Sequence, residues 1–323
     1  MSEKSALDLL RDGPKDDVVV PFKIETANIR GRFVRLGKAV DDVLRIHNYP
    51  EPVSRLLGEA LTLVAMLGSS LKFDGTFSLQ TRSDGPVKML VADYFTPGIL
   101  RGYASYDEAL VKKSTGTSEG LMGKGHLALT VDQGVDTERY QGVVELAGQS
   151  MTDCAHQYFR QSEQIDTTLK LSIANLFKPA EEGEPFASAW RAGGMMVQDL
   201  PDTGGDVDDD IPAPTTRQQQ DEKEDQWRRV GFLLETVSAD ELTDPNLKAE
   251  ELLYALFHED GVRVFPAVPL QAGCRCERER VANVLQKYDR AELDDMASEL
   301  GVIRVTCEFC KTDYDFDPAE FGD

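Results

Sequence analysis

The sequence predicts an α+β fold, in which a mainly antiparallel sheet domain with packed helices is followed by a linker and a small C-terminal domain. Three observations lead to this prediction. Short segments of alternating apolar and polar residues follow one another between turn signals, one long apolar segment has helical spacing, and four of the five cysteines gather near the C-terminus. A chain of 323 residues has room for one large domain, or for two with a linker.

The clearest helix is expected within residues 49–71. Leu57, Leu61 and Val64 recur at helical spacing, and Gly68 is a plausible stop. The longest largely apolar stretch of the chain, ALTLVAMLGSSL, lies here and covers twelve residues. A membrane-spanning helix needs about 20. We therefore expect a helix packed in a core, and no membrane segment.

Strands are expected on both sides of this helix, because short runs of alternating hydrophobicity are separated by turn signals such as SDGP and TPG. These strands cover 18–25, 73–82, 87–95, 99–106, 125–133 and 139–147. A helix at about 151–162 and a further strand at 168–177 should close the domain, which we place at residues 1–178.

Beyond residue 178 the composition changes, and we expect a linker over 179–255. Residues 199–225 contain ten acidic residues, two basic residues and no aromatic one. Such a stretch cannot bury enough apolar surface to offset the entropy of ordering, so we expect it to be disordered.

Helical spacing returns after the acidic stretch, with Leu252, Leu253, Leu256 and Phe257 on one side of a helix. Two interpretations are open. The helix could belong to the core of the last domain, or it could dock on the main domain and be released from it.

Charge and motifs exclude several classes of function. The chain has 57 acidic and 35 basic residues, a formal net charge of −22, and no basic patch, which disfavours nucleic-acid binding. The N-terminus lacks a secretory signal, so a cytoplasmic protein is expected. No G-x-x-x-x-G-K-[ST] loop indicates nucleotide binding, and no Ser/His/Asp set indicates an enzyme.

The strongest chemical signal is the cysteine pattern. Cys274 and Cys276 form a Cys-x-Cys pair, and Cys307 and Cys310 form a Cys-x-x-Cys pair thirty residues later. Tetrahedral zinc sites in proteins use four ligands, often thiolates. We therefore predict that these four residues bind one Zn²⁺ in a C-terminal domain at 256–323. Four thiolates leave no open position for a catalytic water, which favours a structural or regulatory metal.

Other interpretations of the cysteines are weaker. A thioredoxin-like Cys-x-x-Cys should open a helix within a βαβ unit, and too little chain follows the second pair for that fold. A static disulfide framework needs an oxidising compartment, to which no signal directs the chain. A purely structural zinc knuckle remains open.

Redox sensing is favoured by the neighbours of the cysteines. Each cysteine has a partner close enough in sequence to form a disulfide within its own pair, and Arg275, Arg278, Arg280 and Lys311 lie nearby. Positive charge favours the thiolate, which is the form that oxidants attack. For any one of these basic residues, however, a solvated surface position is the favoured interpretation.

Two further residues have side chains that can bind a metal or react with oxidants. His258 lies sixteen residues before Cys274 and is a weak fifth candidate ligand. Cys154, in a segment expected to be helical, is interpreted as a small buried hydrophobic residue without a redox role.

The chain resembles the heat-shock protein 33 family of redox-regulated chaperones. The two cysteine motifs carry this resemblance together with segments that run from about Asn28 to Phe316. These segments are NYPEPVSRLLGEALTLVAMLGSSLKFDG, RYQGVVEL, YFRQSEQ, AGGMMVQ, ELLYALFHEDGVRVF and CRCERERV. The acidic residues 199–225 depart from the family pattern and resemble an insertion in the linker.

The resemblance implies an ATP-independent holdase that is not an enzyme. It implies that oxidation pairs Cys307 with Cys310 and Cys274 with Cys276, expels zinc and unfolds the linker. Exposed apolar surface would then bind unfolding client proteins, in an oxidised form that is a homodimer. The alternative is a constitutive zinc-stabilised protein-binding module without redox switching. A thiol-disulfide enzyme is a third class, disfavoured by the closed thiolate shell.

Overall fold

The computed structural model describes residues 16–71, 74–134, 139–178, 187–199, 216–297 and 301–321. The chain divides into two compact units, Met1–Ala272 and Gly273–Asp323. Among the described residues no helix combines the length and hydrophobicity that crossing a membrane requires.

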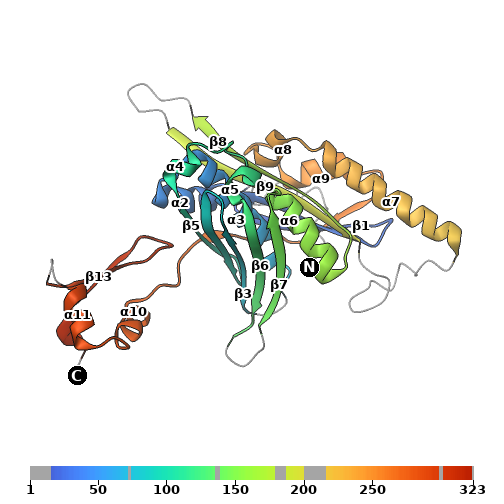
Figure 1. Ribbon diagram of the computed structural model, residues 1–323. Helices are drawn as coiled ribbons and strands as arrows, with labels where there is room; N and C mark the ends of the chain where they lie inside the picture. Colours follow the sequence, from blue (N-terminus) through green and yellow to red (C-terminus); the bar gives the residue numbers. More distant parts are fainter. Residues whose placement is uncertain are drawn as a thin grey trace, which may run out of the picture. The chain divides into compact units, whose positions relative to one another are not determined.

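The first unit contains two largely antiparallel sheets (Figure 1). The first sheet has the order β10 (Val262–Val264), β1 (Val18–Ile24), β2 (Ile29–Leu36), β9 (Ala187–Asp199) and β8 (Thr167–Lys178), with β11 (Val268–Pro269) also paired to β1. The second has the order β12 (Gln271–Ala272), β5 (Ile99–Tyr106), β4 (Val87–Phe95), β3 (Thr76–Ser83), β6 (Lys124–Asp132) and β7 (Tyr140–Ala147). Only the short β12–β5 pair is parallel among these pairings. The α+β prediction is confirmed.

Strand β1 shows why the first sheet needs cover on both faces. Val18, Val20 and Phe22 point into one apolar cluster, whereas Val19 points into another, and all four are at most 1% exposed. Alternate residues of a strand lie on opposite faces of the sheet. An almost continuous apolar run such as VVVPF is therefore typical of a strand buried on both sides.

One face of the first sheet is covered by three helices from late in the sequence: α7 (Arg217–Thr236), α8 (Ala239–Thr243) and α9 (Ala249–Phe257). Leu252, Leu253 and Phe257 of α9 are nearly inaccessible, and the ring of Phe257 stacks on that of Phe22 in β1. The apolar side predicted for this helix is confirmed. It packs on the main sheet rather than in the core of the last unit.

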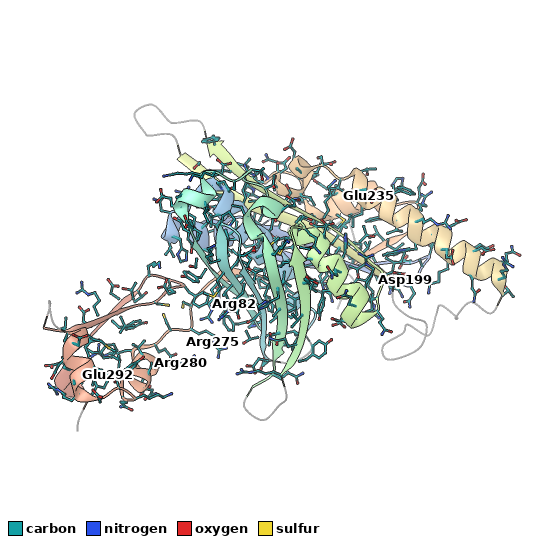
Figure 2. All side chains as sticks on the ribbon, in the orientation of Figure 1. Arg82, Asp199, Glu235, Arg275, Arg280 and Glu292 are labelled. Carbon is teal, nitrogen blue, oxygen red and sulfur yellow. The ribbon has the colours of Figure 1, made fainter. Side chains whose placement is uncertain are left out.

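Part of the acidic stretch 199–225, which the sequence predicts to be disordered, is helical in the structure. Residues 217–225 form the first turns of α7. Lys223 of this helix pairs with Asp199 at the end of β9, and Figure 2 labels Asp199. Arg228 forms ion pairs with Glu224 and Asp225 one turn earlier. Residues 200–215 lie outside the described residues.

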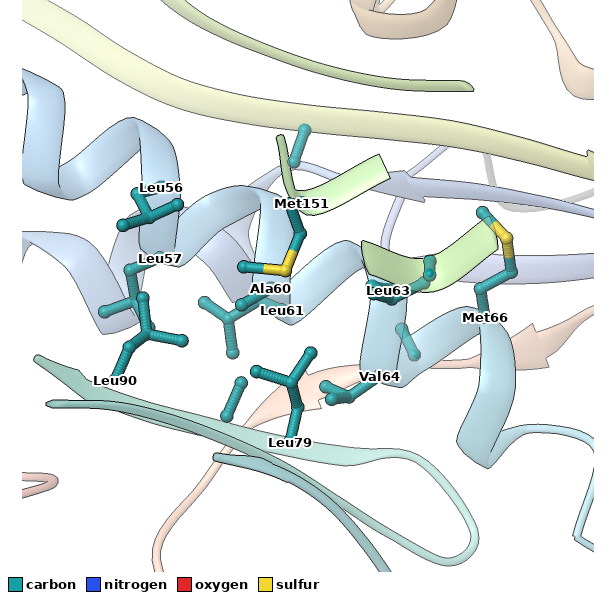
Figure 3. Close-up of a cluster of buried hydrophobic side chains, with 14 of the residues drawn as sticks. Leu56, Leu57, Ala60, Leu61, Leu63, Val64, Met66, Leu79, Leu90 and Met151 are labelled. Carbon is teal, nitrogen blue, oxygen red and sulfur yellow. The ribbon is translucent and has the colours of Figure 1, made fainter. Parts of the chain in front are cut away.

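Helix α3 (Glu51–Gly68) fills the space between the two sheets, together with α2 (Lys38–His47) and α6 (Met151–Tyr158). The predicted helix ends at Gly68 as expected. Its side chains Leu61 and Val64 lie beside Leu79 of β3 (Figure 3). Leu90 of the neighbouring strand β4 belongs to the same cluster. The short helices α4 (Glu108–Val111) and α5 (Ser118–Met122) cover the end of this core, and a π-helical turn, Phe159–Glu163, follows α6.

No expected strand covers β2 or the short strands β10 to β12, and the long strand β9 was not predicted either. Strand β8 does not close the domain, because β9 follows it and pairs with both β8 and β2. Two adjacent glycines interrupt the β9 pattern, and glycine is depleted in strands. Here they permit close packing on both faces: a Cβ on Gly193 would lie 2.1 Å from the Leu242 carbonyl oxygen, and one on Gly194 would lie 2.8 Å from Met66.

The second unit is small and begins at Gly273, whereas the sequence places the last domain at 256–323. It contains α10 (Arg278–Leu285), α11 (Arg290–Met296), the hairpin of β13 (Ile303–Thr306) and β14 (Asp313–Phe316), and a 3₁₀ turn, Pro318–Glu320. Its described apolar core holds only six buried residues, among them Leu285, Ile303 and Phe316. The functional division into 1–178, 179–255 and 256–323 remains an expectation.

Replacing Leu61 with alanine should lower the free energy of unfolding by about 2–5 kcal/mol, because the side chain is fully buried between the two sheets and its loss leaves a cavity. Urea unfolding followed by circular dichroism measures this. The control is Ile46→Ala on α2, where the side chain is 48% exposed and little change is expected. Equal losses for the two variants would contradict the assignment of this core.

Candidate metal centre

The local structure of the second unit brings the four cysteines together. Cys274 and Cys276 lie two residues apart in the irregular segment before α10, and Cys307 and Cys310 occupy the turn between β13 and β14. Two backbone hydrogen bonds close this turn, from the amide of Lys311 to the Cys307 carbonyl (2.8 Å) and from the amide of Cys307 to the Thr312 carbonyl (2.9 Å). Lys311 has a φ of 54°, the left-handed conformation that reverses the chain there.

The sulfur atoms form a compact cluster. All four Sγ atoms lie within 4.8 Å of one another, with 3.7 Å between Cys274 and Cys307 and 3.3 Å between Cys276 and Cys310. Each of these short contacts joins a cysteine of the first motif to one of the second. The sequence prediction that the two motifs form one site is consistent with this geometry.

The spacing of the sulfur atoms agrees with the geometry of a tetrahedral zinc site. Zinc–sulfur bonds of about 2.3 Å in a tetrahedron place neighbouring sulfurs roughly 3.8 Å apart. The distances of 3.3 and 3.7 Å and the upper limit of 4.8 Å bracket this spacing. Four thiolates are also a soft donor set of the kind that zinc occupies. The cluster therefore fits a zinc site without rearrangement of the backbone.

The surroundings shift the pKa values of the Cys276 and Cys310 thiols in opposite directions. Burial, with further hydrogen bonds to neighbouring thiols, raises the pKa of Cys276 to about 12. Burial also acts on Cys310, but the side chain and backbone of Thr312 and the nearby Cys276 and Cys307 outweigh it and bring the pKa of Cys310 down to about 7. The Thr312 hydroxyl lies 3.2 Å from Cys310 Sγ. Cys310 is thus the cysteine most easily converted to thiolate.

A tyrosine hydroxyl lies beside the first cysteine pair. Tyr314 Oη, from β14, is 3.2 Å from both the sulfur and the carbonyl oxygen of Cys276. The hydrogen bond to Cys276 raises the pKa of Tyr314 to about 12, so the phenol stays protonated and can donate. Sequence reasoning missed both Thr312 and Tyr314. The only available signal was their position just after the Cys-x-x-Cys motif.

The basic residues near the cysteines have other partners. Arg278 donates to both carboxylate oxygens of Glu320 at 2.9 Å, and its guanidinium lies 4.1 Å from the centre of the Phe316 ring. Arg280 pairs with Glu277 and Lys311 pairs with Glu308. Arg278 therefore helps to hold the end of the chain on the hairpin. Hydrogen bonds, rather than these charges, produce the low pKa of Cys310.

The two secondary candidates lie in the first unit. Cys154 is fully buried in α6, and burial raises the pKa of its thiol to about 12, which confirms the interpretation as a small buried residue. His258 follows α9, where its ring lies against Tyr254 and its Nδ1 is 3.1 Å from the Tyr254 carbonyl oxygen. It is not part of the sulfur cluster.

Comparison with known proteins agrees with this arrangement. A family model described as Hsp33 protein matches residues 17–317. The 33 kDa chaperonin of Caulobacter vibrioides (strain NA1000 / CB15N) is 43% identical over 311 residues, which cover 95% of this chain and 96% of that protein. The 33 kDa chaperonin of Shewanella loihica is 33% identical and covers 93% of each chain.

The fold is also similar to that of a solved relative. The crystal structure of the 33 kDa chaperonin from Thermotoga maritima superposes with a TM-score of 0.70, covering 94% of this chain and 96% of that one, at 22% sequence identity. The family model spans most of the chain, including the four cysteines, and each similar chaperonin also covers most of the chain. The chain belongs to the Hsp33 family.

Proposed function

We propose that this protein is an ATP-independent holdase chaperone that oxidation activates. The observation that carries the proposal is the cluster of four sulfurs within 4.8 Å of one another, in a chain of the Hsp33 family. In the reduced form Cys274, Cys276, Cys307 and Cys310 would hold one Zn²⁺. When bound, zinc would keep the four sulfurs as thiolates and would cross-link the hairpin to the segment before α10.

The second unit is suited to depend on its metal. Its described core contains six buried apolar residues, too few to hold about 50 residues on their own. Because metal binding and folding are thermodynamically coupled, loss of the ligands would also unfold this unit. A chemical change at four sulfur atoms is thereby converted into a change of structure.

The proposed oxidation takes place at the sulfur atoms of the four cysteines. In each pair one thiolate would attack a peroxide oxygen, forming a sulfenic acid and releasing hydroxide, and the partner thiolate would then displace a second hydroxide to form the disulfide. Two electrons pass from each pair to one peroxide. We propose the pairs Cys274–Cys276 and Cys307–Cys310, as the family resemblance implies.

The surface that would be exposed is the face of the first sheet that α7 to α9 cover. These helices, residues 217–257, are the linker in this proposal, because β9 lies inside the expected linker 179–255 but is a strand of the sheet. Helices α7 to α9 cover apolar residues of β1, β2 and β9, including Val20, Phe33 and Val197. If the linker unfolds, both this face and the apolar sides of the helices reach solvent. Unfolding client proteins would bind there, with an oxidised homodimer as the active form and the cytoplasm as the site of action. A constitutive zinc-stabilised binding module is the alternative.

The decisive experiment compares the reduced, zinc-loaded protein with the same sample after peroxide at elevated temperature. We expect zinc release, measured with a chromophoric chelator, to rise together with suppression of aggregation of a heat-denatured client, and both to reverse with reductant. Peptide mapping should find Cys274–Cys276 and Cys307–Cys310. Equal activity of the reduced protein would favour the constitutive alternative instead.

Replacing Cys307 with serine should lower zinc affinity by more than the roughly 10–100-fold that changes outside the ligand shell cost, because one of four thiolate ligands is lost. Chelator competition measures the affinity. Cys154→Ala is the matched control, since it removes a buried thiol in the other unit and should leave zinc binding unchanged. Full zinc occupancy in the Cys307 variant under competition would refute the four-thiolate site.

Replacing Tyr314 with phenylalanine should speed the reaction of the zinc-loaded protein with peroxide. The hydroxyl donates toward Cys276 Sγ, and a hydrogen bond to a thiolate withdraws charge and weakens it as a nucleophile. The rate of peroxide-dependent zinc release measures this. Tyr288→Phe, 41% exposed in the same unit, is the control and should react like the parent protein. A slower or unchanged rate for Tyr314→Phe would exclude this role.

A further inference from the structure

Four polar side chains on the first sheet donate hydrogen bonds to backbone carbonyls of one linker segment, residues 235–247. Lys170 and Ser172 lie on β8, Arg35 lies on β2, and Arg191 lies on β9. Their partners are carbonyl oxygens of Glu235, Val237, Ala239, Glu241, Leu242, Thr243 and Leu247. The metal centre uses none of these residues.

Lys170 acts at the end of α7. Its Nζ donates to the carbonyl of Glu235, labelled in Figure 2, at 2.8 Å and also to that of Val237. Ser172 Oγ donates to the Ala239 carbonyl at 3.2 Å. The last carbonyls of a helix have no partner within it, and they form the negative end of its dipole. A lysine placed there donates hydrogen bonds to these carbonyls and brings a positive charge to the negative end of the dipole.

Arg35 acts in the same way at the end of α8. It is 0% exposed, and its guanidinium donates to the carbonyls of Leu242 (3.1 Å), Glu241 (2.9 Å) and Leu247. Burial lowers the pKa of Arg35 to about 10, so it remains charged at neutral pH. Burying a guanidinium costs free energy, which its hydrogen bonds to the carbonyls offset. The arrangement is therefore stable only while those carbonyls stay in place.

Arg191 completes the set. Its Nε donates to the Thr243 carbonyl at 2.7 Å, while its terminal nitrogens contact the carboxylate of Asp16, which balances the charge. The backbone approaches equally closely: a Cβ on Gly193 would lie 2.1 Å from the Leu242 carbonyl oxygen. Only glycine at this position lets the end of α8 lie on the sheet.

These contacts matter because α8 cannot persist alone. It has five residues, and isolated helices shorter than about 12–15 residues are marginal in water. A Ser238–Glu241 capping box closes its start, and the two arginines close its end. Since the donors bind backbone carbonyls, they recognise the folded conformation of the segment and not its side chains.

We propose that Lys170, Arg35 and Arg191 form a latch that holds linker residues 235–247 on the first sheet and sets how readily the linker is released. This rests on the proposed function, in which release of the linker is the activating step. The latch acts within the first unit, so its strength can change without any change in the four cysteines.

The test is hydrogen exchange of the full-length, reduced, zinc-loaded protein carrying Lys170→Met. Loss of a charged donor to two carbonyls should accelerate exchange of described linker amides in 230–257 by about tenfold or more. Lys112→Met is the matched control, because Lys112 is 71% exposed and pairs only with Glu108 of its own helix among the ion pairs of the described residues. Zinc content should be unchanged in both.

A second variant, Gly193→Ala, tests the latch by a different route. The added methyl group would clash with the Leu242 carbonyl oxygen and should accelerate exchange of the same amides. Unchanged linker exchange in both variants, with thermal unfolding showing an intact first unit, would overturn the latch even if peroxide activates the parent protein. Faster exchange in both would support it even if peroxide failed to activate any of them, an outcome that would instead remove the proposed redox function.

Discussion

The first sheet is apolar on both of its faces, and the rest of the first unit depends on how each face is covered. Helix α3 lies between the two sheets and is buried along most of its length, so that face is covered mainly by one long helix, with α2 and α6 beside it. The other face is covered by three separate helices, of which α8 and α9 have five and nine residues. Helices of this length draw their stability from docking and not from intrinsic propensity.

This difference suits a cover that can be removed. Burial of Leu253, Phe257 and Val230 contributes an apolar term that scales with area, whereas the contacts of Arg35 and Arg191 depend on the exact position of a few carbonyl groups. Partial unfolding of the linker would keep some of the stabilisation from apolar burial but would lose the hydrogen bonds of the two arginines. Docking would therefore be more nearly all-or-none than apolar contact alone provides.

Much of the fold could be predicted from the sequence, because in those segments the spacing of apolar residues matches the face that the structure buries. Helix α3, the strands β1 and β3 to β8, and the meeting of the two cysteine motifs were predicted from sequence patterns. Strand β9 was missed because Gly193 and Gly194 serve close packing on its two faces, at the expense of strand propensity. Arg35 could not be recognised, since no strand was predicted at 29–36 and a basic residue normally faces water. Thr312 and Tyr314 acquire their meaning only from a turn geometry that places them beside sulfur.

The net charge of −22 gives the proposed open state a further property. A protein that exposes an apolar sheet face risks joining the aggregates it should prevent, and strong like charge opposes association between copies. The residues that the linker leaves behind on that face include the positively charged Lys170 and Arg35, and Arg191, whose charge Asp16 balances. Carbonyl and carboxylate groups of an unfolding chain could then replace those of the linker on the same donors.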